Sequence, residues 1–261
     1  MTTEPGAETL SESSLMSHLL ELRSRLLRSV VAIGIGCIPC VLYANQLFAF
    51  VARPLIKALP KGATLISISL VAPLTTPFKL AMYCGIAIAM PYVLYQIWGF
   101  IAPGLYKHEK RFAVPLLVSS VMLFYMGIAV AYFVVFPLMF KFFTATAPEG
   151  VQMMTDMTQY LDLVLVLFLA FGVAFEIPVA IVLLVYTGVV KLHSLTTNRG
   201  YVLIAVFVQA LVISPPDVVS LCITALPIYA LYEVGILMAR ILTRGKLEAR
   251  AKAQREAENS G

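Results

Sequence analysis

Charged residues are scarce in this sequence, and long stretches of it contain none. Only 13% of its 261 residues are Asp, Glu, Lys or Arg, whereas 60% are hydrophobic. A soluble domain ordinarily has about a quarter charged residues. The composition therefore excludes an ordinary soluble globular domain and indicates a membrane protein.

Signatures of several other protein classes are also missing. Neither a His-Glu-x-x-His, a Gly-x-Ser-x-Gly nor a P-loop pattern occurs, and the three histidines have no ligand partner at a recognisable spacing. The net charge of +5 forms no basic patch interleaved with aromatic residues. We therefore expect no enzyme activity, no metal or other cofactor, and no nucleic-acid partner.

The four cysteines all lie inside apolar runs, where they behave as small hydrophobic residues. Cys37 and Cys40 have the spacing of a redox dithiol, but they do not lie at the N-terminus of a soluble helix. We expect them to be structural. The first 14 residues contain no basic segment followed by an apolar one, so we expect no removable signal peptide.

Uncharged runs long enough to cross a membrane are abundant. The first three cover residues 29–52, 80–106 and 112–140, which are 24, 27 and 29 residues long. Each exceeds the roughly 20 residues that a transmembrane helix needs. A fourth run, residues 163–190, is interrupted only by Glu176. These runs predict four transmembrane helices.

The last two apolar runs are shorter. Residues 201–213 and 218–232 flank a Ser-Pro-Pro-Asp turn, which predicts a helical hairpin. The 13 residues of the first arm reach only about 20 Å, against a hydrocarbon core of about 30 Å. The bilayer is then locally thin, or protein covers the helix ends. The predicted fold is an all-α membrane protein with six transmembrane helices, of which the fifth and sixth are short.

Prolines inside these predicted spans should kink the helices and curve the bundle into a concave shape. Among them are Pro39, Pro91, Pro178 and Pro227. We expect three regions: an N-terminal segment with an interfacial helix (1–28), a six-span domain (29–240) and a charged tail (241–261). The apolar segment 45–76 should cap the outer face, and the tail from residue 245 should be a frayed helix or disordered.

The distribution of basic residues predicts the orientation in the membrane. An even number of spans puts both termini on one side. The N-terminal segment, the tail and the connecting segments on that side carry 14 Lys and Arg, whereas the opposite segments carry five. The positive-inside rule then predicts a multi-pass protein of a bacterial inner membrane with both termini in the cytoplasm.

A polar motif precedes the first span. His18, Glu21, Arg25 and Arg28 fall near one face of a helix, and the opposite face is rich in leucine. By spacing alone, this pattern is typical of an amphipathic helix at the membrane interface with surface ion pairs.

The motif His-Leu-x-Glu-Leu-Arg-x-Arg at residues 18–25 resembles the N-terminal signature of the TatC family. Other segments resemble the same family in order along residues 15–240: the cytoplasmic loop at 100–111, the Phe-Val-Val-Phe-Pro segment ending at residue 137, and segments 146–151, 171–178 and 215–217. The resemblance implies a subunit of the twin-arginine translocase. Such a protein recognises the twin-arginine signal peptides of folded proteins and nucleates a translocon driven by the proton-motive force.

The resemblance also implies partners and a binding site. The expected partners are signal peptides, TatA- and TatB-like single-span proteins, other copies of this chain and membrane lipid. Two adjacent arginines are best bound by carboxylates, and Glu21 and Glu109 are the candidates. The expected supporting residues are His18, Arg23, Arg25, Phe100, Tyr106, Lys107 and His108. For Glu109, the alternative is an ordinary solvated charge.

Four further positions are candidates. Glu176 lies in mid-span, where an ionisable group is costly, and we expect it near Gln209 or water; the alternative is a carboxyl at a helix kink. Asp217 lies at the outer face and is a structural or functional candidate; the structural alternative is that it only caps the start of the sixth span. Pro54 resembles an outer-loop position of the family.

A proton-coupled transporter of a small solute is the main rival function. Glu176 would couple the proton, and Gln96 or Gln209 would line the path. Proton-dependent uptake of a small solute would support it.

Overall fold

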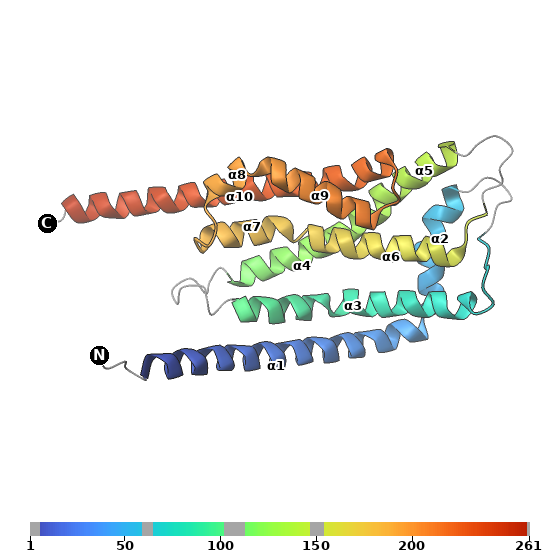
Figure 1. The fold of residues 1–261 in the computed structure, drawn as a ribbon, viewed down its shortest axis with the longest axis horizontal. Helices are drawn as coiled ribbons and strands as arrows, with labels where there is room; N and C mark the ends of the chain where they lie inside the picture. Colours follow the sequence, from blue (N-terminus) through green and yellow to red (C-terminus); the bar gives the residue numbers. More distant parts are fainter. Residues whose placement is uncertain (1–5, 59–64, 102–112, 147–153, 260–261) are drawn as a thin grey trace. The chain divides into compact units, whose positions relative to one another are not determined.

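The computed structural model describes residues 6–58, 65–101, 113–146 and 154–259, and most of them are helical (Figure 1). Over these ranges the β structure is an isolated bridge between Ile66 and Asp156. In chain order the helical segments are α1 (Gly6–Leu42), α2 (Ala44–Ala58), α3 (Ala72–Ile101), α4 (Ala113–Val130), the π-helix η3 (Ala131–Val135), α5 (Phe136–Thr146), α6 (Met157–Ala174), α7 (Ile177–Tyr186), α8 (Leu192–Thr197), α9 (Arg199–Ile213) and α10 (Val218–Asn259).

The predicted all-α membrane fold is confirmed. Five helical segments of the described chain are long and apolar enough to span a membrane, and α9 is a shorter apolar helix. The long segments are Leu19–Leu42, Ala72–Phe100, Val114–Thr146, Met157–Tyr186 and Val218–Leu242. These five segments and α9 correspond to the six predicted spans.

The first span differs from its predicted bounds of 29–52. Helix α1 ends at Leu42, and α2 begins at Ala44 as a separate helix. Val51 and Ala52 are buried in α2, whereas Phe50 and Arg53 are exposed. Helix α2 is amphipathic and contains few charged residues. The uncharged run that predicts the first span therefore extends from α1 into α2. The predicted cap segment 45–76 thus contains a helix.

Of the two predicted short spans, only the fifth is short. The 15 residues of α9 reach about 22 Å. The apolar part of α10 is 25 residues long, because Glu233 does not end the helix. Its carboxylate accepts hydrogen bonds from Arg199 Nη2 at 2.9 Å and the Tyr229 hydroxyl at 3.1 Å. Beyond this span α10 continues to Asn259, so the tail is helical.

The chain divides into two compact units, the first made of residues 1–50 and 77–121 and the second of residues 51–76 and 122–261. In the first unit α1 and α3 lie side by side (Figure 1). A Cβ on Gly36 would lie 2.8 Å from the Gly85 carbonyl oxygen, and one on Gly85 would lie 2.7 Å from Cys37 Cα. The two glycines therefore let the backbones of α1 and α3 approach closely.

The cysteines of α1 belong to this contact. Cys37 and Cys40 are both buried and neither is in a disulfide. The Cys37 thiol donates to the Met82 carbonyl oxygen at 3.6 Å. The predicted structural role of this pair is confirmed.

One side-chain hydrogen bond joins α3 to α4 in the first unit. Trp98 Nε1 donates to Ser120 Oγ at 3.1 Å, and both side chains are buried. A buried indole N–H needs such a partner, so this bond fixes the rotation of α3 against the beginning of α4.

Aromatic side chains make up much of the core of the second unit. Phe136 stacks on Phe140 with ring centroids 5.9 Å apart, and Tyr160 packs against both. The Tyr160 hydroxyl donates to the Val51 carbonyl oxygen at 2.9 Å. Strand-like hydrogen bonds connect Ile66 to residues 155 and 157. Part of the predicted cap segment is therefore held against the start of α6.

The fourth span breaks where the sequence predicts a disturbance. Helix α6 ends at Ala174 and α7 begins at Ile177, with Glu176 at the N-cap position and Pro178 in the first turn. The other three prolines lie inside the continuous helices α1, α3 and α10. The concave shape depends on how the two units are arranged, and it stays a prediction.

Helices α9 and α10 form the predicted hairpin beside α7 (Figure 1). Asp217 Oδ2 accepts the Ser220 backbone N–H at 2.7 Å, which confirms the predicted cap. Buried residues of α6, α9 and α10 form one cluster, consisting of Ala174, Val206, Ala210, Ala225 and Ile228. This cluster holds the short α9 in place.

Candidate functional site

The structure describes part of the predicted binding site. Glu21, Arg23 and Arg25 lie on α1, and Phe100 lies near the end of α3. His18 is also in α1, but its side chain lies outside the described part of the chain, as do the other four predicted residues entirely: Tyr106, Lys107, His108 and Glu109.

Glu21 and Arg25 form an ion pair one helical turn apart. Arg25 Nη2 and Nε both donate to Glu21 Oε1, at 2.7 and 2.9 Å. The Arg25 side chain is 23% exposed and that of Glu21 39%. Both donors use the same oxygen, and no described residue donates to Glu21 Oε2. Glu21 therefore presents one engaged oxygen and one that can accept a further donor.

Helix α3 completes this arrangement, which we call the Glu21–Arg25–Gln96 cluster. The Gln96 side chain is buried, and its Oε1 accepts from Arg25 Nη1 at 3.3 Å. A Cβ on Gly99 would collide with Arg25 Nη1 and lie 3.2 Å from Cζ. The absence of a side chain at Gly99 thus leaves the space that the Arg25 guanidinium fills. On α1, Ser29 Oγ donates to the Arg25 carbonyl oxygen at 3.0 Å.

The cluster is suited to binding a guanidinium. A carboxylate accepts paired, charge-assisted hydrogen bonds from such a group. Arg25 holds the Glu21 carboxylate in a defined orientation and shields its charge until another cation arrives. An incoming arginine can bind Oε2 or displace Arg25, and the partial exposure of the ion pair keeps the cost of displacement low.

Sequence reasoning found Glu21 and Arg25 but missed the contribution of α3. Gln96 was considered only as a lining residue of a transporter path, and Gly99 was not considered. A signal was present, since residues 85, 89, 96 and 99 lie on one face of a helix and are Gly, Ala, Gln and Gly. Such a face of small residues with one amide is typical of close helix packing in membranes.

The mid-span polar residues lie in the second unit. Glu176 is half-buried at the junction of α6 and α7. Gln209 on α9 is exposed, although the next residue, Ala210, is fully buried. The Gln209 amide therefore points away from the buried cluster. That Glu176 lies near Gln209 or water stays a prediction.

The outer-face candidates differ in what they do. Asp217 caps α10, as described above. Pro54 lies inside α2, and its side chain is outside the described part of the structure. Over the described residues, no three His, Cys, Asp or Glu side chains come together as metal ligands would.

Comparison with known proteins identifies the family. The sequence model of the Sec-independent protein translocase protein (TatC) matches residues 17–227. The chain belongs to the TatC family. The resemblance seen in the sequence motifs is thereby confirmed.

Individual members of the TatC family are similar over nearly the whole chain. A Sec-independent protein translocase protein TatC of Azotobacter chroococcum is 51% identical over 245 residues, which cover 94% of this chain and 95% of that protein. The Escherichia coli TatC is 50% identical over 226 residues, covering 87% and 88% of the two chains.

A solved TatC structure is also similar. A crystal structure of the twin-arginine translocase receptor TatC matches with a TM-score of 0.80 and 37% identity, over 87% of this chain and 99% of that one. Membership of the TatC family, together with the apolar helices, makes this chain a multi-pass inner-membrane protein that works in protein translocation.

Proposed function

We propose that this chain is the receptor of a twin-arginine translocase and that Glu21 and Glu109 bind the paired arginines of its signal peptides. The observation that carries the proposal is the Glu21–Arg25 ion pair, in which Oε1 accepts both donors. The similar solved structure is described as a twin-arginine translocase receptor. Glu109 enters through its sequence motif alone.

The remaining predicted residues would support this site. Arg23 and Lys107 would keep the electrostatic potential around the site positive. Each binding carboxylate would then always have a basic neighbour, and a peptide arginine would take the place of that neighbour. His18, His108, Phe100 and Tyr106 would contact the peptide around its arginine pair. After binding, the protein would nucleate a translocon that exports folded proteins, driven by the proton-motive force.

A membrane orientation with both termini in the cytoplasm belongs to the same proposal. It is supported by the 14 basic residues on the side of the termini against five on the other. It puts Glu21 on the side where proteins are synthesised and signal peptides first appear. A cysteine added after Gly261 tests this orientation. Labelling of that cysteine in intact cells by a membrane-impermeant thiol reagent would contradict it.

Single-span partners of the TatA and TatB type would dock on α9 and α10, and further copies of this chain would join the assembly. The support is an exposed apolar face on the short α9. Its large exposed residues are Leu203, Ile204, Val208, Leu211 and Val212. Gln209 lies on the same exposed surface and could bond to a polar group of a partner helix.

The proposal is tested by measuring signal-peptide affinity in membranes. An Arg-Arg peptide and its Lys-Lys variant are titrated against the wild type, Glu21→Gln and Glu109→Gln. Loss of one partner of a charge pair costs about 2 to 5 kcal/mol when the pair is desolvated. Because Glu21 is 39% exposed, we expect the lower end for Glu21→Gln, a loss of roughly 30-fold.

Glu233→Gln is the matched control, because Glu233 is also a glutamate paired with an arginine, at 2.9 Å from Arg199. It should bind the peptide as the wild type does. Equal binding of both peptides, or equal affinity of the Glu21→Gln and Glu233→Gln variants, contradicts the receptor proposal. Proton-dependent uptake of a small solute would then be measured.

A further inference from the structure

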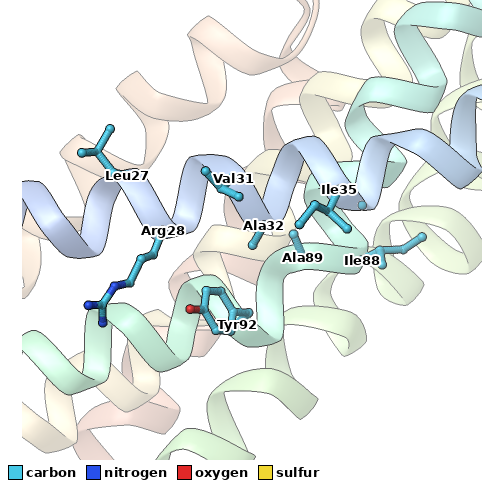
Figure 2. Close-up of a pocket in the computed structure, with 9 residues that line it drawn as sticks. Leu27, Arg28, Val31, Ala32, Ile35, Ile88, Ala89 and Tyr92 are labelled. Carbon is cyan, nitrogen blue, oxygen red and sulfur yellow. The ribbon is translucent and has the colours of Figure 1, made fainter.

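A groove open to the surface runs between α1 and α3 in the first unit. Its volume is about 580 Å³, within the roughly 300 to 1,000 Å³ of small-molecule sites. Val31 and Ile35 of α1 and Ile88 of α3 form apolar walls. Figure 2 shows Arg28 and the Tyr92 hydroxyl toward one end of the groove, with Ile35 and Ile88 toward the other. The groove therefore has a polar end and an apolar end.

Arg28 lies at an unusual depth for a charged residue. The stretch from residue 29 to the end of α1 at Leu42 contains 14 uncharged residues. They extend about 21 Å, which is less than the roughly 30 Å of the hydrocarbon core. If α1 leaves the membrane where it ends at Leu42, the Arg28 backbone lies below the headgroups of the other face, and its side chain must either extend to them or bring an anion inward.

Arg28 also differs from Arg25, which lies one turn before it. Arg25 is engaged by Glu21 and Gln96, whereas no polar contact among the described residues involves the Arg28 guanidinium, which is exposed. A guanidinium near hydrocarbon without an anion is unfavourable. The groove beside Arg28 thus combines an apolar channel with a positive charge that no described side chain pairs with.

We propose that this groove binds an anionic phospholipid. The lipid phosphate pairs with Arg28, the Tyr92 hydroxyl donates to a phosphate or ester oxygen, and one acyl chain lies along Val31, Ile35 and Ile88. This lipid site does not depend on the receptor function proposed above.

The chemistry of the two ends decides in favour of such a lipid. A planar guanidinium matches the geometry of a phosphate with two parallel hydrogen bonds. The headgroup of a zwitterionic lipid carries a cation, which would lie close to Arg28 and repel it. The headgroup of an anionic lipid has no such cation to weaken the pairing of its phosphate with Arg28. Exposed side chains such as Ile35, at 63%, face the hydrocarbon in a spanning helix, where acyl chains are the abundant apolar ligand.

Photocrosslinking of the full chain in liposomes tests the site. The probes are phosphatidylglycerol and phosphatidylcholine that carry a photoreactive diazirine in one acyl chain, and peptide mass spectrometry locates the labelled residues. We expect phosphatidylglycerol to label residues 31–35 and 88–92 about fivefold more than phosphatidylcholine does.

Three variants separate charge from shape. Arg28→Gln should lower phosphatidylglycerol labelling of the groove to the level of phosphatidylcholine. Arg240→Gln is the matched control, since Arg240 is an exposed arginine near the end of another spanning segment, and it should leave the groove labelling unchanged. Ile35→Trp fills the groove at an exposed position and should lower the labelling by both lipids.

Several results would overturn the proposal. One is equal labelling of the groove by the two lipids, and another is equal labelling in Arg28→Gln and Arg240→Gln. A third is labelling spread evenly over the apolar surface of the chain. Crosslinks from the groove to a second copy, with no lipid adduct there, would show that protein occupies it instead.

Discussion

Replacing Gly99 by alanine should move Arg25 and strengthen signal-peptide binding. The added Cβ would collide with Arg25 Nη1 and come within 3.5 Å of Nη2. These atoms are the far end of a flexible side chain, so the guanidinium can move away without a shift of the backbone. Arg25 would then leave Gln96 and loosen its contact with Glu21.

The size of the effect follows from what Arg25 loses. A partly exposed ion pair contributes about 0.2 to 1 kcal/mol, and the long 3.3 Å hydrogen bond to Gln96 adds a contribution near the low end of about 0.5 to 1.5 kcal/mol. If the peptide arginine binds by displacing Arg25 from Glu21, rather than by using the second carboxylate oxygen, this cost of about 1 kcal/mol disappears in Gly99→Ala. Affinity for the Arg-Arg peptide should rise about fivefold.

The assay is the same peptide titration, with Gly34→Ala as the control. A Cβ on Gly34, also on a helix of the first unit, would meet nothing within 4 Å. That variant should bind as the wild type does. Alanine is favoured over glycine in a helix by about 1 kcal/mol, so neither variant should unfold below the wild-type temperature. Weaker peptide binding by a stable Gly99→Ala would refute competition and show that Arg25 positions Glu21.

Three further experiments test the packing. Asp217→Ala removes the cap of α10 and should lower the free energy of unfolding by about 1 kcal/mol, measured by thermal melting in detergent; an unchanged melting temperature contradicts the cap. Gly85→Ala puts a Cβ 2.7 Å from the Cys37 backbone and should destabilise the α1–α3 contact, seen as faster amide exchange there but not in α10. A double-mutant cycle of Arg199→Gln and Glu233→Gln should give a coupling of about 0.2 to 1 kcal/mol, and a coupling of zero would show that the 2.9 Å ion pair adds nothing.

The sequence predicts those boundaries that depend on local chemistry. The prolines of the Ser-Pro-Pro-Asp turn have no backbone N–H, and the turn ends in a good capping residue, so the end of α9 and the start of α10 agree with the prediction. The break at Glu176 was visible for a similar reason, because Pro178 has no N–H to continue the ladder of α6.

Features that depend on distant contacts were not predictable. The π-helix η3 has Ala131 and Val135 buried on one side, and nothing in its apolar sequence distinguishes it from an α-helix. Glu233 looked like the end of a span because its partner, Arg199, is 34 residues away in sequence. In the candidate site, a sequence motif identifies Glu21. The role of Gln96 becomes visible only in the structure, where α3 packs beside α1 and brings Gln96 to Arg25.

The hydrogen bond between Trp98 and Ser120 has a spectroscopic consequence. Trp98 is the single tryptophan of the chain, beside 12 tyrosines, and it lies in the turn of α3 that carries Gln96 and Gly99. Excitation at the red edge of the absorption band selects the indole, so the emission of the unlabelled protein arises from this one position. A peptide that displaces Arg25 and disturbs α3 would change the emission wavelength. The wild-type protein therefore carries its own fluorescent reporter of events at the Glu21–Arg25–Gln96 cluster.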